Sequence, residues 1–349
     1  RKPQSGEQRL ERPDQDLTGE IAASDDELVT SEAANRPPDT AEEINSIGAA
    51  LNADPARDIF LGEKATELQV KRMSLSDRKI IAFATHGLIP GDLDDEAALR
   101  ALLDNCDVVI HLAGAVRGNS QQSFDQTNVR GTQLLLEVLG ARNDLPALIL
   151  ISSLAAREPG LSWYARSKYQ AEQCLRHGPA DLDWAIIRPP AVYGPGDKEM
   201  LPVFLWMARG IAPVPGDPDA RVSLIHVEDL AGAIVACLGL PRLQRRTFTL
   251  DDGTPGGYDW NEMASIAGVV WQRKVRLFRL PRPLLDAMAR ANLALSRVLD
   301  YAPMLTPAKL RELRHRNWVA DNDDITAATG WRPRVRLANG LEELKDSRL

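Results

Sequence analysis

Short apolar segments that alternate with amphipathic segments are the feature that most constrains the fold of this chain. Segments with the length and composition of buried strands lie at residues 79–84, 107–112, 147–151 and 184–188. Segments whose apolar residues follow helical spacing lie between them, at 94–105, 129–139 and 164–176. Strands joined through helices pair in parallel and need helices on both faces. The pattern therefore predicts an α/β fold with a Rossmann-like, doubly wound parallel sheet.

Charge and composition divide the 349 residues into three parts. Residues 1–43 contain five basic and twelve acidic residues, so this tail carries the whole net charge of −7. It has no sustained apolar period, which predicts disorder, with an acidic docking arm as the alternative. Residues 44–93 are expected to form a helix and a strand-helix-strand segment. Residues 94–349 form the main body, with a Rossmann core at about 94–195 and 221–250 and an interleaved, smaller C-terminal lobe at about 196–220 and 251–349.

Composition excludes several classes of protein. No apolar run approaches the roughly 20 residues of a membrane-spanning helix, so we expect no integral membrane segment. No basic cluster suggests nucleic acid as a partner, and no secretory leader is visible. The chain begins with Arg1 rather than Met, so its natural start can lie upstream. The three cysteines (Cys106, Cys174 and Cys237) form no CxxC pair, which disfavours structural metal or disulfides and predicts a cytoplasmic location.

One group of side chains suggests acid–base chemistry. Tyr164 and Lys168 are four residues apart on a predicted helix, so they share a face. A nearby ammonium favours the phenolate, which would let Tyr164 exchange a proton with a hydroxyl or carbonyl group. Ser152 and Ser153 end the preceding strand, and Ser153 could bond the same oxygen. The alternative is an ordinary surface pair on an amphipathic helix.

Five motifs, taken in order, strengthen the acid–base interpretation. They are D-V-V-I-H-L-A-G (107–114), N-V-R-G-T (128–132), L-I-S-S (150–153), Y-A-R-S-K (164–168) and R-P-P-A-V-Y-G-P-G (188–196). Together they resemble the extended short-chain dehydrogenase/reductase family, of the NAD-dependent epimerase/dehydratase type, from about residue 91 onward. The resemblance implies NAD or NADP as cofactor and catalytic roles for Ser153, Tyr164 and Lys168.

The same resemblance implies further ligand contacts. The positions implied for the cofactor are Asp92, Leu93, Leu112, Ala113, Gly114, Lys168, Arg188, Pro189 and Val192. Those implied for the substrate are Ser152 and Tyr193. Asn128 and His111 are expected to be structural residues.

The beginning of the chain departs from the family pattern. A Gly-rich turn after the first strand normally lets the backbone approach the cofactor pyrophosphate. The glycines before residue 115 are Gly6, Gly19, Gly48, Gly62, Gly87, Gly91 and Gly114, and no two are two or three residues apart. We therefore expect the first Gly-rich βα unit to be replaced. A catalytically inactive chimeric or binding protein is the alternative to an enzyme.

The replacing segment has a resemblance of its own. L-G-E-K-A-T-E-L-Q-V-K (61–71) and I-I-A-F-A-T-H-G-L-I-P-G-D-L (80–93) are similar to part of a CHAT domain, a caspase-like peptidase fold. That resemblance implies a base role for His86, but the sequence has no matching nucleophilic cysteine motif. A peptidase relative is the least favoured function. A join near Gly91–Asp94, natural or artefactual, would explain both resemblances.

The predicted activity is hydride transfer at a hydroxyl or keto carbon of a small molecule, by a possible homodimer. A nucleotide sugar, a steroid-like alcohol or another hydroxyl compound remain as substrates. The segment from Ser153 to Tyr164 is shorter than in nucleotide-sugar epimerases, which disfavours a sugar. Residues 283–301 form an amphipathic helix, expected to pack in the lobe, with an apolar-substrate or membrane-surface face as the alternative.

Overall fold

A parallel sheet whose strands are joined through helices forms the centre of the fold. The computed structural model describes residues 41–51, 53, 80–83, 99–100, 103, 106–112, 114–299 and 301–346. The sheet strands, in spatial order, are β1 (Ile80–Phe83), β2 (Val108–His111), β3 (Ala147–Ile151), β4 (Trp184–Arg188) and β9 (Arg246–Thr249). Every neighbouring pair in this sheet is parallel. The predicted α/β fold is confirmed.

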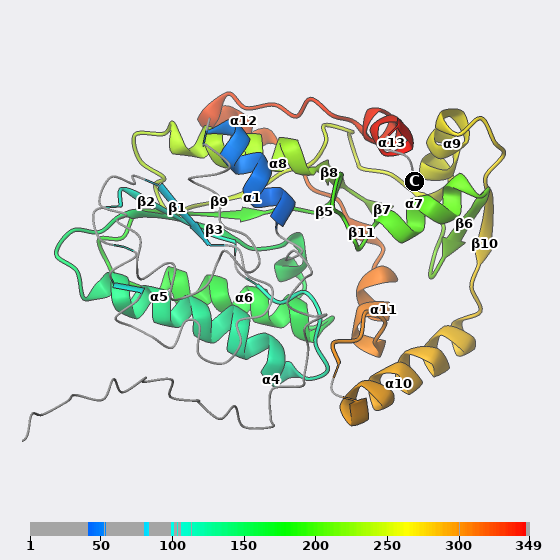
Figure 1. The fold of residues 1–349 in the computed structure, drawn as a ribbon, viewed down its shortest axis with the longest axis horizontal. Helices are drawn as coiled ribbons and strands as arrows, with labels where there is room; N and C mark the ends of the chain where they lie inside the picture. The colour runs from blue at the N-terminus through cyan, green and yellow to red at the C-terminus, as the bar shows by residue number, and fades with distance from the viewer. Residues whose placement is uncertain are drawn as a thin grey trace, which may run out of the picture. The chain divides into compact units, whose positions relative to one another are not determined.

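Helices cover both faces of the sheet (Figure 1). Those on one face are α1 (Ala41–Ala50), α8 (Val227–Leu238) and α12 (Asp323–Thr329). Those on the other are α4 (Gln121–Phe124), α5 (Gly131–Gly140) and α6 (Trp163–Arg176), with the π-helix η2 (Asp125–Arg130) between α4 and α5. The sheet is therefore doubly wound.

The apolar strand segments are explained by these two layers. Along β3, Leu148 and Leu150 point to the core beneath α5 and α6, whereas Ile149 and Ile151 point to the core beneath α8. All four side chains are buried. Each such burial stabilises the fold by about 1.5–3 kcal/mol, so a central strand needs apolar residues at every position.

Two boundaries differ from the sequence expectation. Helix α1 begins at Ala41, inside the predicted tail, because Ile47 packs into the sheet core and the helix lies against α8. Helix α12 was assigned to the lobe, but its Ile325 is buried in the same sheet core. The strand-helix-strand segment expected within residues 44–93 lies outside the described residues, except for its second strand, β1.

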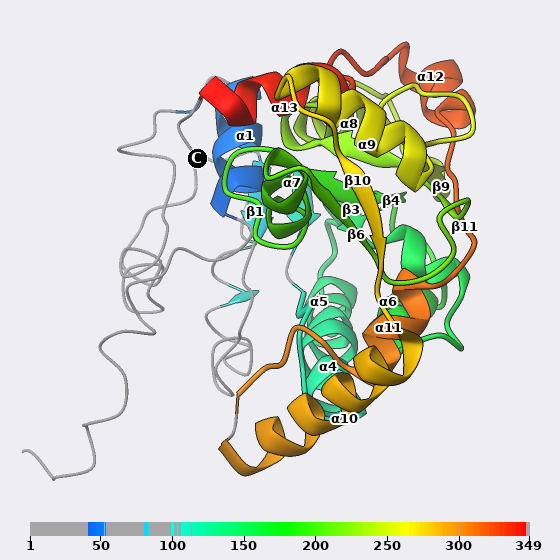
Figure 2. The ribbon, with the colours of Figure 1, turned by 90° about the vertical axis from the view of Figure 1, so that its right-hand side faces the viewer.

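The C-terminal lobe is built from short parallel strand pairs and helices (Figure 2). The pairs are β5 (Ala191–Tyr193) with β8 (Leu224–His226), β6 (Ile211–Val214) with β10 (Arg276–Arg279), and β7 (Arg221–Val222) with β11 (Asn317–Trp318). The helices are α7 (Leu201–Ala208), α9 (Trp260–Val270), α10 (Arg282–Leu299), α11 (Pro307–Leu313) and α13 (Leu337–Asp346). Among the described residues, no helix has the combined length and apolar character needed to cross a bilayer.

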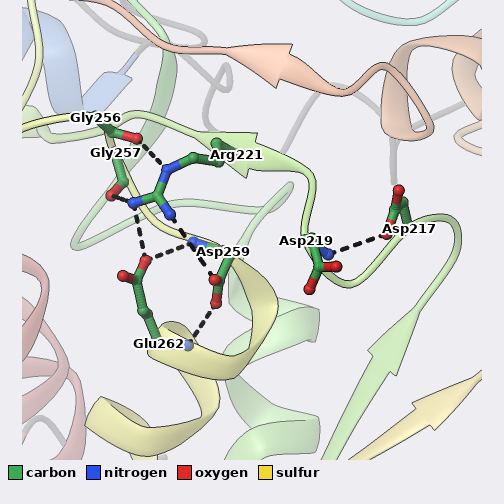
Figure 3. A network of polar contacts seen from close by, with 7 residues as sticks. All are labelled: Asp217, Asp219, Arg221, Gly256, Gly257, Asp259 and Glu262. Atoms are coloured by element: carbon green, nitrogen blue, oxygen red, sulfur yellow. Dashed lines mark hydrogen bonds and ion pairs between the residues drawn. The ribbon is translucent and has the colours of Figure 1, made fainter.

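Arg221 ties the lobe strand β7 to the start of α9 (Figure 3). Its guanidinium donates to the carbonyl oxygens of Gly256 (2.5 Å) and Gly257 (2.7 Å) and to a carboxylate oxygen of Glu262 (3.1 Å). Gly257 has a φ of +63°, and a Cβ there would lie 2.6 Å from the carbonyl oxygen of Val222 in β7. Only glycine therefore fits at this position. Asp259 and Glu262 form a capping box that begins α9.

His226 and Asp229 lie at the start of α8. His226 is the residue before the helix, but its side chain makes no capping hydrogen bond. The carboxylate of Asp229 accepts backbone N–H groups from Arg334 (2.9 Å) and Val335 (2.8 Å). Asp229 therefore attaches the segment before α13 to α8 rather than capping its own helix.

Candidate active site

Helix α6 carries Tyr164, which is expected to exchange the proton, and Lys168, which is expected to favour its phenolate. The hydroxyl of Ser162 caps the helix by accepting the backbone N–H of Ala165 (2.9 Å), which fixes where its first turn begins. Tyr164 lies in that turn, half-buried beside the ring of Phe124. Lys168 lies one turn later on the same face of the helix.

The ammonium group of Lys168 lies at the carboxyl end of the sheet. The side chain is only 6% exposed, and Nζ donates a hydrogen bond to the carbonyl oxygen of Ile151, the last residue of β3 (3.1 Å). A Cβ built on Gly114, just after β2, would lie 2.6 Å from this Nζ. A side chain at Gly114 would therefore displace the lysine ammonium from this position.

Asn128 holds this arrangement together from the π-helix η2. Its Oδ1 accepts the backbone N–H of Ala115 (2.7 Å), and its Nδ2 donates to the carbonyl of Ala115 (3.1 Å) and the hydroxyl of Ser167 (2.8 Å). It thus joins the loop after β2 to the residue beside Lys168. Single π-helical turns often occur at functional sites. The structural role expected for Asn128 is the one observed.

Ser153 is placed by the short 3-10 helix η3 (Leu154–Arg157) that follows β3. Its Oγ accepts the backbone N–H of Ala155 (3.2 Å), so the hydroxyl proton can still be donated. The backbone N–H of Leu154 donates to the carbonyl of Pro189, which lies just past β4 (2.8 Å). The predicted residues around 114, 153, 168 and 189 thus gather where β2, β3 and β4 end.

Ser152 and Arg188 are both bonded to Glu172, a residue that the sequence reasoning missed. Glu172 is fully buried on α6 and accepts the hydroxyl of Ser152 (2.6 Å). The guanidinium of Arg188 donates to both of its oxygens (2.8 and 2.6 Å), and this raises the pKa of Arg188. Their side chains therefore have a structural explanation without a ligand. The available signal was spacing, because Glu172 continues the face of Tyr164 and Lys168.

Tyr193, expected to touch substrate, lies in the lobe core. Its side chain is 0% exposed, and its ring packs edge-on against Phe204 (5.8 Å) and His226 (5.3 Å). A Cβ on Gly340 would lie 2.5 Å from the tyrosine ring. Burial raises the pKa of Tyr193, and its hydroxyl has no hydrogen-bond partner. This geometry gives no support for a substrate contact.

His111 is the buried last residue of β2, with Nε2 3.2 Å from the hydroxyl of Thr132. Burial, followed by the charge of Lys168, lowers the pKa of His111 to about 3. The ring is therefore neutral at physiological pH, which agrees with its expected structural role.

The remaining residues expected to contact the cofactor, and His86, do not add to this described group of side chains. Leu112 and Val192 pack against the sheet core beneath α8. The predicted positions Asp92, Leu93, Ala113 and His86 lie outside the described residues. In the part of the chain that is described, no group of three His, Cys, Asp or Glu residues could hold a metal ion.

Comparison with known proteins identifies relatives over most of the chain. The sequence model of the NAD dependent epimerase/dehydratase family matches residues 61–248. Ceramide reductase of Caulobacter vibrioides is 40% identical over 74% of this chain and 79% of that protein. Sterol-4-alpha-carboxylate 3-dehydrogenase of Candida albicans is 23% identical over 73% of this chain and 81% of that protein.

Solved structures share the fold. UDP-glucuronic acid 4-epimerase from Bacillus cereus, in complex with UDP-glucuronic acid and NAD, matches with a TM-score of 0.55 and 20% identity, over 71% of this chain and 77% of that one. The family match begins at residue 61 and thus includes residues 61–93. No comparison supports the CHAT resemblance of that segment.

Proposed function

Because this chain belongs to the NAD dependent epimerase/dehydratase family, we propose that it is an NAD(P)-dependent oxidoreductase acting on a hydroxyl or keto carbon. The observation that carries the proposal is the buried ammonium of Lys168, held at the carboxyl ends of β2 and β3, one helical turn from Tyr164. Ligands of open α/β sheets bind at this edge.

The described residues fit the nicotinamide-ribose half of the cofactor. Gly114 leaves its backbone bare beside Lys168, and Asn128 fixes the loop that carries it. The sequence offers no Gly-rich turn for the pyrophosphate half, and the residues after β1 lie outside the described part of the chain. The chemistry can therefore be derived only for the nicotinamide end.

Tyr164 is the proton donor and acceptor of the proposed reaction. When bound, the nicotinamide supplies or takes up the hydride. In reduction of a ketone, the carbonyl oxygen gains the Tyr164 hydroxyl proton while its carbon gains the hydride. Lys168 favours the phenolate that results, and Ser153 donates a hydrogen bond to the substrate oxygen. Oxidation of the alcohol reverses these transfers.

A lipid-like alcohol or ketone is the favoured substrate class. The relative with 40% identity is named for ceramide, and another is named for a sterol carboxylate. The short connection to α6 leaves little chain for a sugar-binding loop. It is occupied by η3, whose Arg157 donates to the carbonyls of Asn317 (2.5 Å) and Val319 (2.9 Å).

Cofactor binding and turnover test the proposal in sequence. NADH and NADPH are titrated into the full chain while nicotinamide fluorescence is followed. NADH oxidation is then measured with long-chain ketones, and conversion of UDP-glucuronic acid in the presence of NAD is followed by product analysis. Tyr164→Phe should abolish turnover without weakening cofactor binding. Tyr169→Phe, an exposed tyrosine on the same helix, is the matched control.

The opposite results are equally informative. Absence of binding at millimolar cofactor would reject the proposal and favour a non-catalytic α/β protein, as the missing glycines suggest. Undiminished turnover in Tyr164→Phe would remove the tyrosine from the mechanism. If UDP-glucuronic acid were converted and the long-chain ketones were not, the substrate class would be nucleotide sugars rather than lipid-like alcohols or ketones.

A further inference from the structure

Helix α10 exposes an apolar surface that the proposed chemistry does not use. Its exposed large apolar residues, which we call the α10 apolar face, are Leu284 (56% exposed), Met288 (51%), Leu295 (52%), Val298 (80%) and Leu299 (63%). They follow helical spacing along the whole helix, so they form one continuous stripe. Contiguous exposed apolar surface of this kind marks an interaction site.

An adjacent side of α10 is firmly packed against α11, so the exposure of the stripe is a property of the fold. Leu285 and Ala289 pack with Leu310 of α11. Asp286 pairs with Arg314 at 2.7 Å, and the side chain of Asn292 donates to the carbonyl of Leu305 at 2.9 Å. Rotating the helix to bury the stripe would break all of these contacts.

Exposed basic residues lie on the other side of α10 and in the segment that precedes it. Residues 273–299 contain seven basic side chains and one acidic one, although the chain outside its acidic tail is neutral. The basic residues, all exposed, are Arg273, Lys274, Arg276, Arg279, Arg282, Arg290 and Arg297. An apolar stripe with arginines on the polar face is the pattern of a helix that lies in a membrane interface.

The charge pattern also decides between occupants. A second copy of the chain, docked through the same face by a two-fold axis, would bring no counter-charge to these arginines. An anionic lipid surface matches the apolar stripe and the basic surroundings together. We propose that α10 docks this protein on anionic membranes, with the α10 apolar face in the acyl-headgroup boundary.

The docked helix would lie close to the catalytic helix. From α11, Glu312 accepts a hydrogen bond from Ser162, the cap of α6, and Arg311 donates to the carbonyl of Leu161 (2.8 Å). A membrane contact at α10 would thus bring Tyr164 near the lipid surface. This link to catalysis rests on the proposed function, whereas docking itself does not.

Sedimentation with vesicles, without cofactor or substrate, tests docking separately from turnover. Full-length protein is mixed with vesicles of phosphatidylcholine alone and of phosphatidylcholine and phosphatidylglycerol in equal parts. We expect binding mainly to the anionic vesicles, weakened by added salt. Removal of each arginine, as in Arg290→Gln and Arg297→Gln, should weaken that binding about fivefold.

Paired substitutions identify the surface. The double variant Leu295→Asn with Val298→Asn should bind vesicles at least tenfold more weakly than the wild type. Val269→Asn, at an equally exposed valine on α9 (77% exposed), should leave binding unchanged. The proposal would be overturned if the α10 double variant and Val269→Asn lost vesicle binding equally, or if the wild-type chain did not bind vesicles. So would a concentration-dependent dimer in sedimentation equilibrium that Val298→Asn disperses, because the face would then join two copies.

Discussion

Glu172 provides the strongest test of how the predicted site is held together. Its carboxylate is fully buried and is shared between the guanidinium of Arg188 and the hydroxyl of Ser152. In Glu172→Gln the amide nitrogen would face a guanidinium donor, leaving a charge without its partner. Breaking a buried ion pair on one side costs about 3–5 kcal/mol. Because the Arg188 side chain keeps 19% exposure, we expect the lower end, about 3 kcal/mol.

The surface pair Arg130–Glu137 supplies the matched control. Its atoms are 3.0 Å apart, but the two side chains are 51% and 58% exposed. Glu137→Gln should therefore cost less than about 1 kcal/mol. Urea unfolding followed by circular dichroism gives both free energies of unfolding on one scale.

A double substitution separates the pair from simple damage to the core. In Glu172→Gln with Arg188→Met the unpaired charge is gone, so the double variant should be more stable than the sum of the single losses predicts. Losses in Glu172→Gln and Glu137→Gln that agree within about 0.5 kcal/mol would refute the reasoning. Strict additivity in the double variant would refute it as well.

Three further comparisons test other contacts. In Gly114→Ala the new Cβ would lie only 2.6 Å from the ammonium nitrogen of Lys168, so the lysine should shift and turnover in a steady-state assay should fall at least tenfold. Gly160→Ala is the control, because a Cβ at Gly160 meets no atom within 4 Å. Between pH 6.5 and about 3, His111 is protonated in the unfolded state but not in the folded state, so the free energy of unfolding decreases as the pH is lowered. When the pH is lowered from 7 to 5, the wild type should therefore lose about 2 kcal/mol more of this free energy than His111→Asn, as measured by urea unfolding. Tyr193→Phe removes an unpaired hydroxyl and should not destabilise, whereas Tyr258→Phe, whose hydroxyl donates to a buried carboxylate at 2.5 Å, should cost about 1–3 kcal/mol by thermal unfolding.

Local spacing was enough to predict the elements that build the site. The strand segments were recognisable because both faces of the sheet are covered, so apolar residues run without alternation through β3 and β4. Tyr164 and Lys168 were predicted together because one helix sets their separation. Both inferences depend on residues close in sequence.

Tertiary contacts were beyond that reasoning. Glu172 meets Ser152 across 20 residues and Arg188 across 16, and no periodicity encodes such a meeting. Tyr193 follows a motif associated with ligands, yet packing against Phe204 places it in the lobe core. Helix α12 packs in the sheet core, although the residues before and after it belong to the lobe, because the chain returns to the Rossmann core late in the sequence.

Hydrogen bonds among described residues between 111 and 189 hold the proposed catalytic cluster together. Lys168 is held by β3, Asn128 by the loop after β2, and Ser152 by Glu172 and thus by Arg188. These bonds place Tyr164 and Lys168 at the carboxyl ends of β2 and β3, where the proposed reaction needs them. If the chain binds a nicotinamide, this pair would supply the proposed acid–base chemistry, while the affinity for the whole dinucleotide would depend also on the residues before 115, which carry no Gly-rich turn.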